Sequence, residues 1–290
     1  MRKLLLIPAL VIVWPVTWYA SALWANHRAV PAPDKAVLAS SLGHAVGWLE
    51  ADMKGARSYT DPYLWWMLKQ SAEITRDQHL VSLYNHIEPL LLKKRSWYIW
   101  SGMFDPEAKV ELPPFSTLRF LPYYDYLYLY GLTCNTDWGN ESEVRRQLHP
   151  DFCSLHFLHP NCTTRQLLGV RFMQRNGCGD PDRVAGLARE LQDRIVAELD
   201  WDPRVTDAYI MRVLMLVESG VSDRVRPVWI QRILDAQHAD GGWGDVDPIL
   251  PLPNGKVLGF ASAGPAYRKL HSDFRTTAKC VRLLALLLDR

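Results

Sequence analysis

The sequence predicts an all-α protein whose helices form an α/α toroid, an inner ring of helices inside an outer ring, behind an N-terminal transmembrane anchor. Apolar residues recur at steps of three and four over most of the chain, which is the period of an amphipathic helix. Other segments are apolar nearly all round, and such helices must be enclosed by neighbours. Strand-like alternation is sparse. We therefore expect an anchor at residues 1–25, a linker at 26–34 and one domain at 35–290.

The first element is an uncharged apolar run from Leu4 to Ala25, preceded by Arg2 and Lys3. The run is long enough to span a bilayer as a helix, and its tryptophans gather toward the far end, where an interfacial aromatic belt is expected. The preceding cations predict a single-pass protein of the cell membrane with its body on the extracytoplasmic, periplasmic side. The alternative is a signal peptide cleaved after Ala20-Ser21-Ala22. Both interpretations export the body.

The distribution of charge excludes nucleic acid as a partner. The chain carries 33 basic and 31 acidic side chains, a formal net charge of +2. Residues 1–30 contain three cations and no acid, so the remainder has 33 − 3 = 30 basic against 31 acidic side chains. A nucleic-acid-binding protein concentrates basic residues on one face, and no such block occurs after the N-terminus.

After the linker Pro31-Ala32-Pro33, amphipathic and enclosed helices are expected in alternation. Apolar stripes predict amphipathic helices over residues 38–53 and 184–199, and Asp180-Pro181 supplies the N-cap and first position of the second. Enclosed helices are expected near residues 63–68, 209–217 and 281–288. Residues 97–118 and 241–272 are rich in proline and glycine and are expected to be long loops.

Four aspartates stand near the starts of expected inner helices: Asp61, Asp125, Asp207 and Asp273. If those helices are parallel, their carboxylates meet at one rim of the toroid, where a cluster could perform acid–base chemistry or bind a cation. Simple helix capping is the alternative explanation of each aspartate. His271, two residues before Asp273, and His44, in the first amphipathic helix, are candidate general bases, although lone histidines are more often structural.

Aromatic residues are the candidate ligand-contacting groups. Eleven of them fall between residues 97 and 130, and Tyr124, Tyr126 and Tyr128, with Trp65 and Trp66 of an enclosed helix, could line a cavity. Ring faces stack on sugars and stabilise isoprenoid cations. The alternative is that these rings fill the core.

Five cysteines, an odd number, fit an exported protein with one or two disulfides and a leftover thiol. Cys153 and Cys162 are the expected pair. The same stretch contains His156 and His159, so the four side chains could instead bind zinc or copper. Pro160 interrupts the helical register and the spacing is not that of a usual zinc site, which favours a disulfide-closed loop.

The segment from Arg226 to Gly244 resembles a QW repeat, the motif of the terpene cyclase and protein prenyltransferase superfamily. Gln237 followed by Gly241-Gly242-Trp243 fits the tail of the motif, whereas Pro227 and the polar pair Gln231-Arg232 depart from its head. The resemblance implies an α/α toroid, and it implies that Gln237, Gly242 and Trp243 tie an outer helix to the next inner one. Similar Asp-Gly-Gly-Trp turns occur in toroid lyases that act on polysaccharides.

The catalytic signatures of that superfamily are largely missing. Its protonating cyclases use an Asp-x-Asp-Asp run, where this chain has only Asp245-Val-Asp247-Pro248, and the zinc ligands of the prenyltransferases have no counterpart. The sequence therefore predicts a membrane-anchored toroid protein, either an enzyme acting on a lipid-linked, isoprenoid or glycan substrate or a noncatalytic binding or assembly module. A metal-handling protein is a further alternative. No cofactor is indicated.

Overall fold

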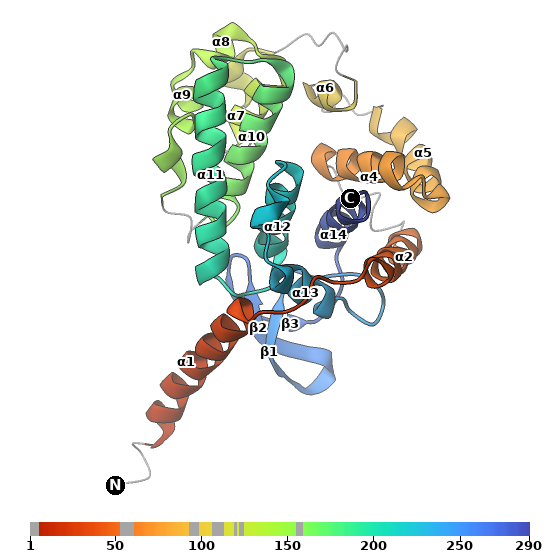
Figure 1. Ribbon diagram of the computed structural model, residues 1–290, viewed down its shortest axis with the longest axis vertical. Helices are drawn as coiled ribbons and strands as arrows, with labels where there is room; N and C mark the ends of the chain where they lie inside the picture. The colour runs from red at the N-terminus through yellow and green to blue at the C-terminus, as the bar shows by residue number, and fades with distance from the viewer. Residues whose placement is uncertain are drawn as a thin grey trace.

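The fold is mostly helical, as the sequence predicts, with one small sheet (Figure 1). The computed structural model describes residues 6–52, 61–92, 99–105, 113–118, 121, 125–154 and 159–290, without the side chains of 6–15 and 90–92. The longer helices are α1 (Leu6–His27), α2 (Lys35–Ala51), α4 (Pro62–Thr75), α5 (Gln78–Leu92), α7 (Tyr126–Thr133), α10 (Cys162–Asn176), α11 (Pro181–Trp201), α12 (Asp207–Glu218), α13 (Pro227–Asp235) and α14 (Phe274–Leu288). Shorter ones are α6 (Ser101–Phe104), η3 (Phe115–Leu118), α8 (Thr136–Gly139), α9 (Ser142–Gln147), η5 (Pro150–Cys153), η6 (Ser222–Arg224) and η7 (Pro253–Gly255).

Helices α12 and α14 form the centre of the helical body. Every residue of α12 from Asp207 to Val217 is buried, and α14 is buried over most of its length. α14 packs against α2, α4 and α12, whereas α12 also packs against α10 and α11 (Figure 1). Both helices are surrounded by other helices, and this packing removes nearly all of their apolar side chains from water.

The predicted helix boundaries are confirmed where capping residues set them. Asp180 caps α11 by accepting the backbone N–H of Arg183, and Pro181 follows at the first helical position. Asp61 and Asp273 cap α4 and α14 in the same way. Asp207 departs from the pattern because Thr206 occupies the N-cap position and Asp207 is the first residue of α12.

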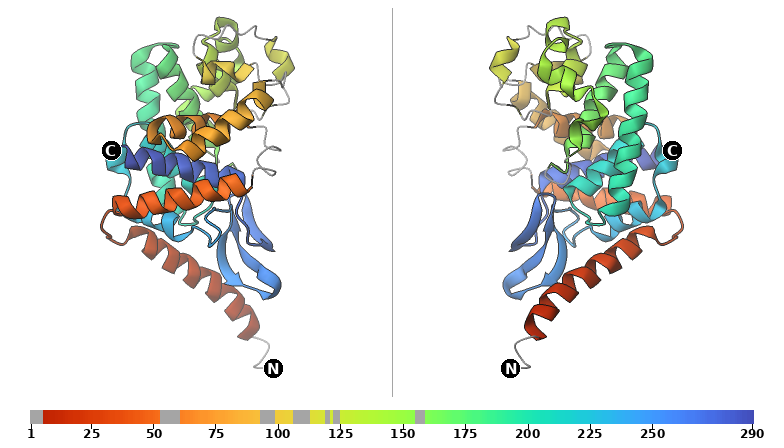
Figure 2. Two further views of the ribbon diagram at one scale, coloured as in Figure 1. Left: turned by 90° about the vertical axis from the view of Figure 1, so that its right-hand side faces the viewer. Right: turned by 90° about the vertical axis from the view of Figure 1, so that its left-hand side faces the viewer.

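A three-stranded antiparallel sheet takes up most of residues 241–272, so the prediction of a long loop there is wrong, although the fold as a whole is mostly helical. β1 (Asp247–Pro251), β2 (Lys256–Ala261) and β3 (Gly264–Lys269) pair in the order β1-β2-β3. The strands are short, and proline and glycine interrupt them, so their alternation is too brief to stand out in the sequence. The sheet projects beside α1 from one end of the helical body (Figure 2).

The C-terminal part of α1 is fastened to the body. Asn26 is fully buried; its Nδ2 donates to the carbonyl of Leu199 at 2.7 Å, and its Oδ1 accepts from Tyr209 and Arg232. Trp18 packs on Phe260 of β2 with ring centroids 5.2 Å apart. The expected anchor begins in residues 1–5, which lie outside the described residues. Within the described part of the chain, no helix combines the length and the apolar character that a membrane crossing requires.

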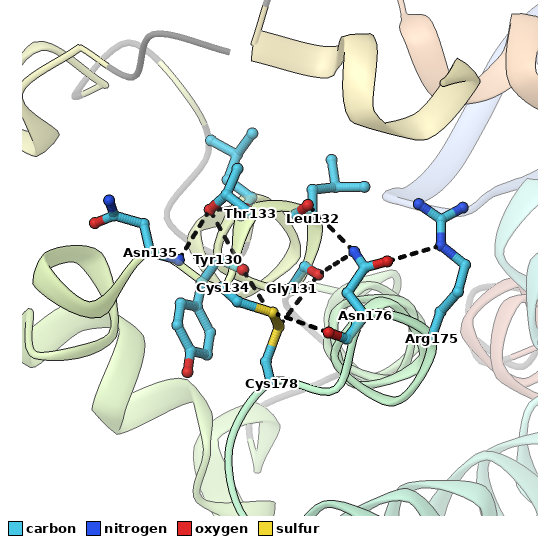
Figure 3. The surroundings of a disulfide bond; sticks show 10 residues. Tyr130, Gly131, Leu132, Thr133, Cys134, Asn135, Arg175, Asn176 and Cys178 are labelled. Carbon is cyan, nitrogen blue, oxygen red and sulfur yellow. Dashed lines mark hydrogen bonds between the residues drawn. A yellow bond between two sulfur atoms is a disulfide. The ribbon is translucent and has the colours of Figure 1, made fainter. Parts of the chain in front are cut away.

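Two disulfides stabilise the region around α7 and α10. Cys153–Cys162 confirms the predicted pair, and Cys134–Cys178 is a second one that sequence reasoning did not identify. The latter joins the end of α7 to the turn after α10, where Asn176 also donates to the carbonyls of Gly131 and Leu132 (Figure 3). Cys280 is left as a buried free thiol.

Candidate functional site: a carboxylate pocket

A pocket of about 210 Å³ lies where the first turns of α12 and α14 meet the sheet. It brings together three of the site residues predicted from the sequence, Asp207, Asp273 and His271. The remaining lining residues are Asp245, Val246, Arg268, Lys269, Arg275 and Thr276. The pocket therefore joins the start of α12 to the segments before β1 and after β3, and the second of these leads directly into α14.

Hydrogen bonds hold two of the carboxylates in place. Asp273 Oδ1 accepts the backbone N–H of Thr276 at 2.9 Å, and its Oδ2 accepts the backbone N–H of Asp245 at 3.1 Å. Asp245 Oδ1 in turn accepts the backbone N–H of Asp207 at 3.0 Å and the hydroxyl of Ser262 at 2.7 Å. The N-cap residue Thr206 makes no side-chain hydrogen bond to α12, and Asp245 supplies that capping hydrogen bond instead.

Asp207 is held by a buried cation. Lys279 Nζ, from the middle of α14, lies 2.5 Å from Asp207 Oδ1, and the two side chains are 6% and 5% exposed. A charge buried this deeply needs an opposite charge beside it, and the Lys279 ammonium and the Asp207 carboxylate meet that need for each other. The pair also ties α14 to the first turn of α12.

The pKa of Asp273 is raised, first by burial and also by the nearby charge of Asp207, although the hydrogen bonds from Thr276 oppose the shift. A carboxyl group with a raised pKa holds its proton at a higher pH than an exposed aspartate does. Such a group is suited to proton transfer, whereas Asp207 beside Lys279 is suited to charge stabilisation.

His271 has one ring nitrogen committed by the backbone. Its Nδ1 lies 3.0 Å from the carbonyl oxygen of Lys269, and since a carbonyl can only accept, Nδ1 carries the proton. In the neutral ring, Nε2 then has a free lone pair and can act as a base. His271 is exposed at the pocket mouth.

The other two predicted carboxylates form a separate pair. Arg165 of α10 lies 3.5 Å from Asp61 Oδ2 and 3.9 Å from Asp125 Oδ1. Burial raises the pKa of Asp125. Tyr63 follows Asp61 by two residues, and its hydroxyl lies 3.4 Å from Glu218. Glu218 is the last residue of α12 and Asp207 is the first, so Asp61 lies toward the opposite end of α12 from Asp207. The prediction that all four carboxylates meet at one rim is therefore corrected to two separate pairs.

The predicted cavity aromatics are buried within the core. Trp65 and Tyr128 are 0% and 2% exposed, and Trp66 and Tyr126 are 8% exposed each. Tyr128 packs against Trp100 and Phe172 with ring centroids 5.2 Å away in both cases, and the Trp65 ring packs on Phe274 at 4.9 Å. None of these four lines the carboxylate pocket. Tyr124 lies outside the described residues.

The metal-site alternative loses two of its four ligands. Cys153 and Cys162 are joined as a disulfide, and an oxidised sulfur is no longer the thiolate that binds zinc or copper. His156 lies outside the described residues, and His159 lies three residues before Cys162. In the part of the chain that the structure describes, no three histidine, cysteine or carboxylate side chains are grouped as metal ligands.

The QW-like segment consists of α13 and the turn that follows it. Gln237 Nε2 donates to the carbonyls of Ser41 in α2 and of Gly241, at 2.9 and 2.7 Å. The Trp243 indole is buried and donates to the carbonyl of Ile233 at 2.7 Å, and its backbone N–H donates to Thr277 of α14. Gly242 packs directly against Ser272. The contacts of these residues join helices, and Gly244 continues the turn toward His271.

His44 lies away from the carboxylate pocket. It is exposed on α2 and borders a shallow depression with Ser41 and Gln237. Its backbone carbonyl faces Gly241 so closely that a side chain at Gly241 would collide with it. The structure thus places His271, but not His44, beside the carboxylates.

Sequence reasoning missed Lys279, the buried partner of the pocket residue Asp207, and Arg268, which lines the pocket. A lysine inside an otherwise apolar helix is itself a signal, because buried lysines are found almost only with a partner charge. Arg268 gave no such signal, because its place beside Asp245, at 3.8 Å, depends on the unexpected sheet.

The pocket therefore combines an aspartate with a raised pKa, a carboxylate fixed by a buried lysine, and a histidine with one available ring nitrogen. Proton transfer, hydrogen bonding to a polar ligand, and charge stabilisation are all within the reach of such a set. Comparison of this chain with protein-family models, with curated proteins and with solved structures returned no match.

Proposed function

We propose that this protein is an extracytoplasmic, membrane-anchored enzyme that performs acid–base chemistry on a glycan, or on the glycan part of a lipid-linked substrate, in the carboxylate pocket. The observation that carries the proposal is the meeting of Asp207, Asp273 and His271 in one pocket. In this mechanism Asp273 supplies a proton and the Nε2 of His271 accepts one, while Asp207 with Lys279 holds the local charge.

The lining of the pocket favours a glycan over an isoprenoid chain. Three carboxylates, from Asp207, Asp245 and Asp273, face three cations, from Arg268, Lys269 and Arg275. A lining rich in both hydrogen-bond acceptors and donors suits a ligand with many hydroxyls, because sugar hydroxyls both donate to carboxylates and accept from cationic N–H groups. The described lining contains no phenylalanine, tyrosine or tryptophan, whose ring faces would stabilise an isoprenoid cation.

The proposal is tested with nitrophenyl glycosides of neutral hexoses, N-acetylhexosamines and uronic acids. Saturation-transfer NMR measures binding, and release of nitrophenol measures turnover. We expect His271→Gln to lose turnover while retaining binding, since the imidazole is exposed and its loss leaves the capping hydrogen bonds intact. His44→Gln is the matched control, because His44 is an exposed histidine outside the pocket. Failure of every glycoside to bind contradicts the proposal.

A noncatalytic binding module is the second candidate. It is favoured by the hydrogen bonds that occupy Asp273 and Asp245, because a carboxylate committed to backbone N–H groups is restrained from transferring a proton. A glycoside that binds the wild-type protein without being turned over, and that binds His271→Gln equally well, identifies the module rather than the enzyme.

The anchor and the toroid are parts of the same proposal. The uncharged run from Leu4 to Ala25 with Arg2 and Lys3 before it supports the anchor, and two disulfides fit an oxidising compartment. Enclosed helices at the centre and the QW-like contacts of Gln237 and Trp243 support a toroid related to the terpene cyclase superfamily. Two measurements test the anchor: whether the protein stays in the membrane fraction after alkaline carbonate extraction, and where the mature chain begins by N-terminal sequencing. A mature chain starting at Leu23 identifies a cleaved signal peptide instead.

A further inference from the structure

Exposed large apolar side chains gather at the end of the molecule where α1 meets the sheet. Of nine such residues among the described side chains, eight lie on α1, at the end of α11, or in and beside the sheet. They are Val16, Tyr19, Trp24, Trp201, Leu250, Leu258, Tyr267 and Leu270, with Val37 as the exception. Trp201 and Tyr267 are 70% and 63% exposed. An apolar grouping of this kind on one end of a protein marks an interaction surface.

Three of these residues form a row across the outer face of the sheet. Leu250 pairs with Leu258, and Leu258 pairs with Tyr267, so all three side chains point to the same side. The neighbouring Val257, which points to the opposite side, is buried. Phe260 shares the face of Leu258, two positions along β2, and packs on Trp18 of α1. The outer face of the sheet is therefore continuous with α1.

Two lysines complete this face. Lys256 and Lys269 stand directly opposite each other on β2 and β3, on the side of Leu258, and Lys256 Nζ lies 4.8 Å from the centre of the Tyr267 ring. Like charges directly opposite each other destabilise a sheet, so an anionic partner that neutralises both lysines would stabilise this pair. A mixture of apolar rings and lysines is typical of surfaces that lie in the headgroup region of anionic bilayers.

Helix α1 and the sheet lie side by side, so a membrane that α1 enters would also meet the sheet. Residues 18–27 of α1 are held against the body through Trp18, Tyr19 and Asn26. Because residues 18–27 are held against the body, only the part of α1 before Trp18 can enter a bilayer, and that part is shorter than a full transmembrane span. The bilayer surface then lies close to Trp18, and Phe260 with its sheet lies beside it. Figure 2 shows the sheet and α1 extending from the same end of the body.

We propose that the outer face of the sheet, defined by Leu250, Leu258, Tyr267, Lys256 and Lys269, is a second membrane contact that binds anionic phospholipid headgroups. The direction of approach rests on the proposed anchor, whereas the contact residues are independent of it. The sheet then orients the body, and with it the carboxylate pocket, relative to the membrane surface; Lys269 belongs both to this face and to the lining of the pocket.

Site-directed spin labelling of the full chain in phosphatidylcholine vesicles containing phosphatidylglycerol tests the proposal. Labels are attached to cysteines introduced as Leu258→Cys, Tyr267→Cys and Val16→Cys, while the native Cys280 is buried and unlabelled. Asp182→Cys is the control position, since it is exposed at the end of α11 remote from Trp201. Collisions of the spin label with molecular oxygen show that the label lies in lipid, and collisions with a water-soluble nickel complex show that it lies in water.

We expect the labels at 258 and 267 to lose access to the nickel complex and retain access to oxygen, while the label at 182 stays in water. Labels at 258 and 267 that remain in water overturn the inference, and a lipid-exposed label at 16 then leaves the anchor standing. A lipid-exposed label at 267 with a label at 16 in water supports the inference and contradicts the anchor. Loss of access to both collision partners indicates a protein contact and also overturns it.

The charge requirement is tested separately. The double variant Lys256→Glu/Lys269→Glu is expected to return the label at 267 to water, and so are vesicles of phosphatidylcholine alone. Arg189→Glu, an exposed cation on α11, is the matched control and leaves the label in lipid. Retention of lipid contact by the double variant contradicts the proposed role of anionic headgroups.

Discussion

Lys279 and Asp207 form an ion pair inside the helical body, where neither charge would be stable without the other. Both side chains are nearly inaccessible to water, so each charge depends on the other for the hydration it has lost. We expect Lys279→Met to lower the free energy of unfolding by about 3–5 kcal/mol, because it leaves the Asp207 carboxylate buried without a cation. Urea denaturation followed by tryptophan fluorescence measures the change.

The double variant Lys279→Met/Asp207→Asn is the control for this pair. It removes both charges, so it is expected to recover part of the lost stability. A loss below about 1 kcal/mol in the lysine variant alone would show that water reaches Asp207.

His238 links stability to pH at the residue scale. Its Nδ1 lies 3.0 Å from Ser272 Oγ, and its pKa is lowered from 6.5, mainly by burial and also by His271, against the opposing charge of Asp240. Because the folded chain binds this proton less readily than the unfolded chain, the contribution of His238 to stability is full above pH 6.5 and falls as the pH drops below it.

We therefore expect His238→Gln to flatten the loss of stability between about pH 7 and about pH 5. Thermal unfolding at a series of pH values measures the slope, with His44→Gln as the control histidine. An unchanged slope in the His238 variant would assign the acid sensitivity to other groups.

At the scale of elements, the two disulfides close loops of very different length. Cys134–Cys178 spans 44 residues and Cys153–Cys162 spans 9. The loss of chain entropy on closure predicts stabilisation of about 4 kcal/mol for the longer loop and about 2.6 kcal/mol for the shorter one. We expect Cys134→Ala/Cys178→Ala to lower the free energy of unfolding more than Cys153→Ala/Cys162→Ala does. Equal losses in guanidinium denaturation would mean that strain or residual structure outweighs loop length.

The turn that follows α13 requires glycine at residue 242. A β-carbon there would lie 2.5 Å from Ser272 Cβ and 2.9 Å from the Trp48 ring, both closer than van der Waals contact. Gly242→Ala is therefore expected to destabilise the fold by about 1–3 kcal/mol, the usual cost of overpacking. Gly186→Ala is the matched control, since that position in α11 is open and alanine favours the helix. Thermal unfolding that ranks the two variants equally would contradict this account.

At the scale of the whole molecule, Asn26 fastens α1 to the body. Its side-chain amide bridges α11, α12 and α13 through Leu199, Tyr209 and Arg232. Asn26→Ala leaves the Leu199 carbonyl and the Arg232 guanidinium short of a partner, which costs about 1–3 kcal/mol. We expect faster proteolysis within residues 28–34, measured by limited digestion. Asn254→Ala, which changes an asparagine of the sheet turn, is the control, and equal proteolysis of both variants would exclude docking of α1 through Asn26.

The helices of the body could be predicted from the sequence because their signals are local. The caps at Asp61, Asp180 and Asp273 each depend on residues two or three positions away, and the apolar period of α2 and α11 extends over four or more turns. The Cys153–Cys162 disulfide is local in the same sense. Neither the sheet nor Cys134–Cys178 has such a signal. The strands are only five or six residues long, and the two cysteines are 44 positions apart in the sequence.

The sequence by itself determined that the chain is mainly helical, where its caps lie, and which carboxylates begin the central helices. Only the tertiary structure decided which of those carboxylates meet. Asp207 and Asp273 share a pocket because α12 and α14 pack side by side and Lys279 bridges them, whereas Asp61 and Asp125 are drawn to Arg165. Helix period and capping are properties of neighbouring residues, but the partner of a buried charge is set by how whole helices pack, and no local pattern records that choice.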